Sequence, residues 1–287
     1  MITGENVRLA HLVGREDGPR ERSWQADDAL RYALAVGAGW DDPCTELSLT
    51  TENTAGVTQQ ALPTLAVVLA EYGGPQQVLA GVVDLTRVLH AEQEFTLHRP
   101  LPVSGRMVVR RRITEVLDKG SGALVVAETV GADPDGRPLV TTRSSLFVRG
   151  AGGFGGPRGD TTAWHVPDRE PDVVARFRTL PGQALLYRLT GDRNPLHSDP
   201  SCAARAGYDR PILHGMCTYG ITCRLLVGAL CGGDPTRVTG MSGRFTRPVF
   251  PGDELTVSAW VEGGTARFRT TGAAGALVLD RGTFTFR

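Results

Sequence analysis

Helical and strand-like hydrophobic patterns follow one another along the chain in a similar order in its two halves. Residues 27–37 combine an amphipathic period with an acidic start and a final glycine, which is typical of a helix. Continuous apolar runs at 62–69 and 214–230 predict two buried helices. Shorter helical segments are expected at 183–189 and 200–206.

Between these helices, β-branched and other apolar residues alternate with polar ones, and this alternation predicts antiparallel strands. Turn sequences rich in Asp and Gly separate neighbouring strands, as at 118–120 and 133–136. The highly charged segment 15–22 predicts an irregular lead-in instead. The expected strands lie at 5–12, 97–102, 107–116, 123–130, 139–148, 238–245, 254–261, 266–271 and 277–286.

A sequence repeat links the two halves of the chain. Residues 99–105 (RPLPVSG) resemble residues 247–252 (RPVFPG), and both lead into an alternating strand. The repeat predicts an α+β fold in which each half wraps an antiparallel sheet around a long central helix. We expect an N-terminal half at 1–148, a glycine-rich linker at 149–162 and a C-terminal half at 163–287.

The glycine-rich segment 150–159 (GAGGFGGPRG) is the one stretch that suggests a phosphate-binding loop. It lacks the GxxxxGK[ST] motif, and no helical pattern follows it directly. We therefore interpret it as a linker or a close-packed crossing between the halves.

The composition is that of a soluble globular protein. Of the 287 residues, 41% are hydrophobic and 22% charged, and the formal net charge is zero, which excludes bulk attraction to nucleic acid or to a membrane surface. The five cysteines form no CxxC pair, which favours a reducing cytoplasm over a disulfide framework. We expect no signal peptide, no membrane span and no peroxisomal address at the C-terminus.

Asp192, Asn194 and His197 are the candidate catalytic side chains. Pro195 lies between them and disfavours a helix, so we expect a loop that turns the acid and the imidazole toward a common point. The first half has no counterpart of this group before its apolar helix, which predicts one site per chain. No third clustered ligand accompanies Asp192 and His197 in the sequence, so we predict no metal.

Gly215 begins the second apolar helix, and this position suits an anion. The first-turn N–H groups of a helix have no partner within the helix, and they lie at the positive end of its dipole. A glycine there also lets a ligand approach the backbone. The sequence thus offers an oxyanion site beside the loop, and we interpret the neighbouring His214 as structural.

These motifs resemble those of the (R)-specific enoyl-CoA hydratases, called hydratase 2, within the MaoC-like dehydratases. The resemblance extends over about residues 25–287 and implies the two-domain, double hot-dog form of the family. The segments that carry it are LYRLTGDRNPLHSDP at 186–200, PILHG at 211–215, LPT at 62–64, VLHAEQ at 88–93, DKG at 118–120 and RGAGGFGG at 149–156.

The resemblance implies that Asp192 and His197 hold a water molecule and share the acid and base roles in its addition to a trans-2-enoyl thioester. It places the thioester oxygen on the amide of Gly215 and gives Asn194 an orienting role in catalysis. It implies no cofactor, and it makes acyl-CoA the partner. The implied substrate-binding residues are His90, Ala91, Lys119, Arg193, Pro195, Leu196 and Phe245; alanine stands at position 91 where the family often has glycine.

Three other functions stay open at this level. The same site fits a dehydratase acting on a carrier-bound or specialised-metabolite thioester. A thioesterase would release free CoA instead. A non-catalytic acyl-thioester binding module is disfavoured because both titratable residues are present. A homodimer is compatible with each of these functions.

Overall fold

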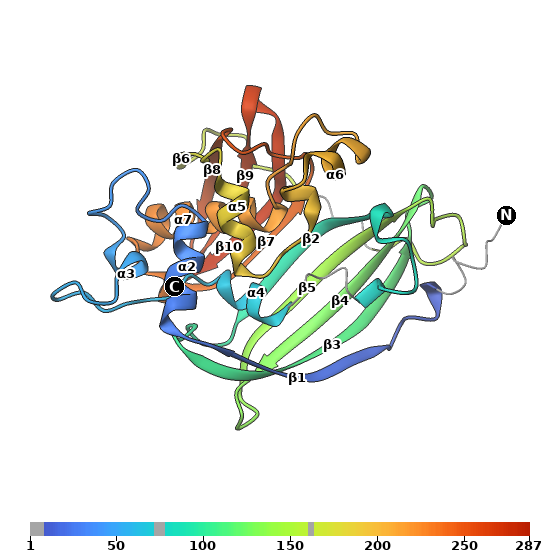
Figure 1. The fold of residues 1–287 in the computed structure, drawn as a ribbon, viewed down its shortest axis with the longest axis horizontal. Coiled ribbons are helices and arrows are strands. Elements are labelled where there is room, and N and C mark those ends of the chain that lie inside the picture. Colours follow the sequence, from blue (N-terminus) through green and yellow to red (C-terminus); the bar gives the residue numbers. More distant parts are fainter. Residues whose placement is uncertain (1–8, 72–77, 160–163) are drawn as a thin grey trace.

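A single ten-stranded antiparallel sheet organises the protein in the computed structural model, which describes residues 9–71, 78–159 and 164–287. Its strand order is β1-β3-β4-β5-β2-β7-β10-β9-β8-β6, and it curves around the helices (Figure 1). The strands are β1 (Glu16–Trp24), β2 (Val88–Leu97), β3 (Gly105–Asp118), β4 (Gly122–Ala132), β5 (Pro138–Arg149), β6 (Val173–Arg178), β7 (Val238–Phe245), β8 (Glu254–Glu262), β9 (Thr265–Thr271) and β10 (Leu277–Phe286).

The order of strands confirms the repeat. The first half contributes β1-β3-β4-β5-β2 and the second contributes β7-β10-β9-β8-β6, which is the same arrangement read from the opposite edge. The two copies meet where β2 pairs with β7, from Glu92 opposite Arg244 to Thr96 opposite Gly240. The segments 99–105 and 247–252 both lead from the seam strand of their half into the next strand, β3 or β8.

The helices lie on the concave side of the sheet, and α7 is the central one of the second half (Figure 1). It is apolar on almost every face, as expected of a helix enclosed by protein. The helices are α2 (Ala26–Ala35), α3 (Leu47–Thr50), α4 (Leu65–Ala70), α5 (Gln183–Tyr187), α6 (Pro200–Arg205) and α7 (Gly215–Cys231), with short 3₁₀ turns η2 (Leu85–Arg87), η3 (Arg188–Thr190), η4 (Pro195–His197), η5 (Pro235–Arg237) and η6 (Ala273–Gly275).

The first half departs from the expected long central helix. Its apolar helix, α4, has only six residues. Helix α2 lies beside α7, where Gly220 permits close approach: a Cβ there would stand 2.7 Å from the Tyr32 hydroxyl. The Arg224 Nε donates a hydrogen bond to the Val36 carbonyl at 3.0 Å across the same contact. The short α4 leaves space on the concave side of the first half.

Three expectations about strands are wrong. Only Leu97 of the segment 97–102 lies in a strand, because β2 ends there. Residues 9–10 of the expected strand 5–12 are helical, and 1–8 lie outside the described residues. The charged segment 15–22 belongs to the edge strand β1, in which only Trp24 is buried, so no alternation marks it. The sequence pattern also missed β6, which closes the other edge of the sheet.

The glycine-rich segment packs tightly against the turn between β3 and β4. The Asp118 carboxylate accepts hydrogen bonds of 2.8 Å from the amides of Gly120, Gly153 and Gly155. Those amides, that of Gly153 first, lower the pKa of Asp118 to about 2. These bonds fix the described part of the segment against the β3–β4 turn.

Among the described helices, none combines the length and the apolar character that crossing a bilayer requires. The buried Cys217 and Cys223 are core residues of α7, as expected. Burial raises the pKa of both thiols, which keeps them protonated.

Candidate active site

A compact loop between η3 and η4 carries the acid. Gly191, with φ of +136°, turns the chain before Asp192. The Asp192 Oδ1 accepts the Asn194 amide at 3.1 Å, and the Asn194 Oδ1 accepts the Leu196 amide at 3.0 Å. Pro195 then begins η4, and the φ angle that its ring fixes suits the first position of a helix. These contacts fix the loop, so Asn194 caps the turn that presents His197.

His197 is buried as a neutral base. Its Nδ1 lies 2.9 Å from the Ile212 carbonyl, which can only accept, so Nδ1 carries the proton. Burial lowers its pKa from the usual value, and the Ile212 hydrogen bond and the nearby Asp192 partly oppose that effect. Within the part of the chain described, Nε2 has no hydrogen-bond partner. That lone pair is free to accept a proton.

His214 supports both catalytic candidates. Its ring stacks on that of His197, with centroids 3.8 Å apart and planes 28° apart. Its Nε2 donates to the main-chain oxygen of Asp192 at 3.3 Å. Burial lowers the pKa of His214 to about 2, and the neighbouring His197 adds to the shift. The residue is neutral and structural, as expected, and it joins the acid loop to the buried imidazole.

Asp192, His197 and His214 also form a three-residue cluster that the sequence did not reveal. One potential ligand atom from each lies within 4.8 Å of the others. Stacked imidazoles project their lone pairs in nearly parallel planes, whereas a metal must lie in the plane of each ring that binds it. The three residues therefore do not fit a metal ion unless one ring rotates. The sequence-based argument that a third ligand is missing was wrong, because His214 is close enough to be one.

The start of α7 lies against Phe245. A Cβ on Gly215 would stand 3.3 Å from that ring, so the glycine keeps this end of the helix open. The Phe245 ring contacts the half-buried His90 of β2, with centroids 4.9 Å apart. Burial lowers the pKa of His90, and the carboxylates of Glu71 and Asp192 partly offset it. His90 and Phe245 thus join the two halves at the site.

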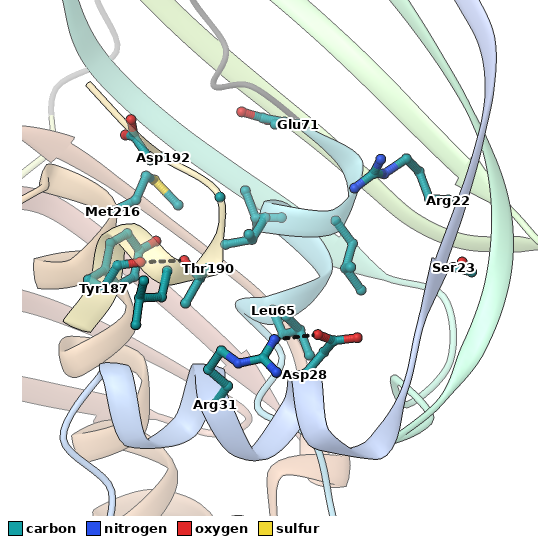
Figure 2. A pocket seen from close by; sticks show the side chains of 15 residues that line it. Arg22, Ser23, Asp28, Arg31, Leu65, Glu71, Tyr187, Thr190, Asp192 and Met216 are labelled. Carbon is teal, nitrogen blue, oxygen red and sulfur yellow. Dashed lines mark hydrogen bonds and ion pairs between the residues drawn. The ribbon is translucent and has the colours of Figure 1, made fainter. Parts of the chain in front are cut away.

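A cavity adjoins Asp192 and runs into the first half (Figure 2). Its empty volume, including the part that opens to solvent, is about 930 Å³. Asp192 and Met216 belong to the second half, whereas Leu65, Val68 and Glu71 belong to α4 and the residue that follows it. The cavity occupies the space that the short α4 leaves.

The other predicted contacts differ in position. Lys119 lies in the β3–β4 turn, separated from β2 and His90 by β4 and β5, and its Nζ donates to the Arg158 carbonyl. Ala91 lies at an irregularity in the pairing of β2 with β5. Arg193 is exposed on the catalytic loop. The structure therefore brings His90, Phe245 and Gly215 together beside the candidate pair and places Lys119 away from them.

Glu71 and Met216 are cavity residues that the sequence did not single out. Met216 follows Gly215 directly, so its position in the first turn of α7 was the available signal. Glu71 interrupts an apolar run at 65–70 with a charge, and it is only 6% exposed. A buried carboxylate of this kind is rare unless it is paired.

Comparison with known proteins gives consistent matches over nearly the whole chain. The family model described as the MFE-2 hydratase 2 N-terminal domain matches residues 23–150, and that described as the MaoC like domain matches 162–281. The 3-hydroxyacyl-thioester dehydratase Y of Mycobacterium tuberculosis is 44% identical over 94% of this chain and 95% of its own. Enoyl-CoA hydratase ChsH3 of the same organism is 44% identical over 90% of each chain.

Solved structures agree with these matches. A MaoC-like dehydratase from Phytophthora capsici superposes with a TM-score of 0.86 at 31% identity and covers 97% of both chains. A Mycobacterium tuberculosis protein described as having a double hotdog fold superposes with a TM-score of 0.61 over 96% of both chains, at 20% identity. The expected double hot-dog fold is confirmed, with its two sheets joined into one.

Proposed function

We propose, from the premise that the chain belongs to the MaoC-like dehydratase family in its two-domain hydratase 2 form, that it reversibly hydrates trans-2-enoyl-CoA to (3R)-3-hydroxyacyl-CoA. The enzyme is then a hydro-lyase. The observation that carries the proposal is the pairing of Asp192 with a neutral His197 beside the start of α7 and a cavity. Relatives named as enoyl-CoA hydratase and as 3-hydroxyacyl-thioester dehydratase support the same chemistry in its two directions.

The catalytic pair handles the water. Asp192 and the Nε2 of His197 each accept a hydrogen bond from one water molecule, whose oxygen bonds to the β-carbon of the substrate. One of the two residues takes a proton from that water as the base, and this proton is then passed to the α-carbon, so that H and OH of one water molecule add across the double bond and the pair shares the acid and base roles. Dehydration reverses each role. The neutral state of His197, caused by its burial, supports it as a proton acceptor.

The start of α7 stabilises the charge that develops. Addition of oxygen to the β-carbon moves an electron pair onto the thioester oxygen, which becomes enolate-like. The Gly215 amide donates to that oxygen, and the dipole of the 17-residue α7 adds to the effect. The absence of a side chain at Gly215, with Phe245 close by, supports access of the thioester to this amide.

The two halves of the chain then have different functions. The second half, 163–287, carries catalysis, and the first half, 1–148, shapes the acyl pocket, with 149–162 as the crossing between them. The cavity beside α4 supports medium and long acyl chains. His90 and Phe245 bind the substrate where the halves meet, and the loop residues Arg193, Pro195 and Leu196 flank it. We place the enzyme in the cytoplasm and propose that it forms a homodimer.

The test follows loss of the enoyl-thioester absorbance of crotonyl-CoA and decenoyl-CoA with purified protein. The wild type is expected to consume both, and Asp192→Asn and His197→Ala are expected to lose at least about a hundredfold in kcat, since each removes a group that moves a proton. The exposed Asp135→Asn is the matched control. Activity in the two site variants equal to that of the wild type would contradict the proposal, and release of free CoA would indicate a thioesterase.

Dehydration of a carrier-bound acyl group is the second candidate, because the name of the relative, 3-hydroxyacyl-thioester dehydratase Y, specifies a thioester but not CoA as its carrier. The catalytic residues are the same in both cases. A panel that presents one acyl group on CoA and on an acyl carrier protein separates the two, through kcat/KM for each carrier.

A further inference from the structure

A buried carboxylate in the first half faces the acyl cavity. Glu71 directly follows α4, is 6% exposed and lines the same cavity as Asp192. Figure 2 shows its carboxylate extending from the α4 side of the cavity toward the side that carries Asp192. A charge in such a place is expensive to bury unless it is hydrogen-bonded or paired.

One of its two oxygens is fully occupied. The Glu71 Oε1 accepts hydrogen bonds from Ser144 Oγ at 2.5 Å, Thr142 Oγ1 at 2.6 Å and Gln93 Nε2 at 3.1 Å. The Ser144 hydroxyl also lies 2.9 Å from Gln93 Oε1, which ties the cluster together. The donors come from β2 and β5, so the inner face of the sheet fixes the position of the carboxylate.

The second oxygen is free. In the described ranges, Oε2 of Glu71 makes no hydrogen bond and no ion pair, while Oε1 takes all three donors. Anchoring α4 to the sheet requires only the bonds to Oε1. A carboxylate oxygen that is held rigidly at the wall of a ligand cavity is placed to accept a hydrogen bond from a ligand.

The rest of the cavity wall indicates which ligand carries that donor. The cavity wall carries a group of apolar side chains, including Leu65, Val68 and Met216, together with charged ones such as Arg22 and Arg31. The apolar group accepts a hydrocarbon chain. On an acyl chain held by this apolar group, a donor that reaches Oε2 is a substituent of the chain, and a hydroxyl is the neutral donor that brings no further charge into the cavity.

We propose that Glu71 is a specificity-determining residue that accepts a hydrogen bond from a hydroxyl group on the acyl chain, so that hydroxylated enoyl thioesters are preferred over plain alkyl ones. The inference rests on the proposed hydratase function, and it names a substrate class for it. Glu71 takes no part in moving the protons of the reaction. Its effect is on which acyl chain is held beside Asp192.

The experiment compares trans-2-decenoyl-CoA with decenoyl-CoA analogues that carry one hydroxyl at successive positions beyond the double bond, with crotonyl-CoA as the reference for basal activity. For at least one position, the wild type is expected to show kcat/KM about tenfold to a hundredfold above that for decenoyl-CoA, the range for a hydrogen bond to a charged group. Glu71→Leu is expected to abolish this preference while retaining hydration of crotonyl-CoA.

Two further variants keep the test decisive. Glu94→Gln removes a carboxylate from the exposed face of the same region and serves as the matched control, with the preference unchanged. Thr142→Val leaves Glu71 in place but removes one donor to Oε1, so it is expected to weaken the preference and serves if Glu71→Leu does not fold. The preference is expected to fall mainly through KM, because the hydroxyl is bound before and during the reaction.

The outcomes separate the two claims. Hydration of crotonyl-CoA and decenoyl-CoA with no preference for any hydroxylated analogue would overturn the role of Glu71 and leave the hydratase function standing. A preference that survives both Glu71→Leu and Thr142→Val would also overturn it. Failure of the wild type to hydrate any of the thioesters would overturn the proposed function itself.

Discussion

The stacked pair of His197 and His214 makes acid stability a direct test of the site. His214 is fully buried, and burial lowers its pKa from 6.5 to about 2. The unfolded chain therefore binds a proton at this residue as pH falls through about 6.5, whereas the folded chain does not until about pH 2. Stability contributed by neutral His214 is thus present above about pH 6.5 and is lost progressively below it.

The perturbation is His214→Phe, which keeps a flat ring against His197 and Tyr187 but cannot titrate. One proton bound only by the unfolded state changes the free energy of unfolding by about 1.4 kcal/mol per pH unit. The wild type is therefore expected to lose up to about 3 kcal/mol more than the variant between about pH 6 and about pH 4. At neutral pH the variant loses the 3.3 Å hydrogen bond to the Asp192 carbonyl, which costs about 1 kcal/mol.

Urea unfolding of both proteins at several pH values measures this difference. Tyr187→Phe, which alters the neighbour of His214 without removing an imidazole, is the matched control and is expected to show the wild-type pH slope. Equal pH slopes for His214→Phe and the wild type would refute the reasoning, because the buried neutral imidazole would then contribute nothing to acid sensitivity.

Two other predictions concern buried polar contacts outside the candidate site. Arg224→Met is expected to lower the free energy of unfolding by about 3 kcal/mol, because it removes the 2.8 Å ion pair of a buried guanidinium with Glu46. The control is Arg178→Met at an exposed arginine, which is expected to cost less than about 1 kcal/mol in the same urea titration. Equal losses in the two variants would contradict the prediction. Because amide hydrogen bonds lower the pKa of Asp118 to about 2, its stabilising contribution is present above about pH 4 and is lost as pH falls toward 2. Asp118→Asn is expected to release 150–159 for limited proteolysis at neutral pH, and protection equal to the wild type would count against that anchoring role.

Local sequence signals were sufficient for much of the second half. The bounds expected for β7 and β10 match the structure, and α7 differs by one residue at each end. Here apolar length, alternation and glycine ends act together. The catalytic loop was also predictable, since Asp192 and His197 lie within six residues and Pro195 excludes a helix between them.

The first half was less predictable for physical reasons. Strand β2 contains a pairing irregularity near Ala91 and the buried polar Gln93, and both disturb the alternation by which a strand is recognised. The stacking of His214 on His197 and the approach of β5 to Glu71 depend on tertiary packing. No local pattern encodes such contacts, so the sequence could not predict the cavity or the hydrogen bonds that hold Glu71 at its wall.

The seam between β2 and β7 has a consequence for how the protein loses its structure. If either half unfolded alone, the seam strand of the other would become an edge, with its N–H and C=O groups bare from Glu92 to Thr96 or from Gly240 to Arg244. The contact between His90 and Phe245 beside the candidate site would be lost at the same moment, because the two rings meet across this seam. Duplication of the fold has thus made each copy depend on the other to cover the edge of its sheet at the seam.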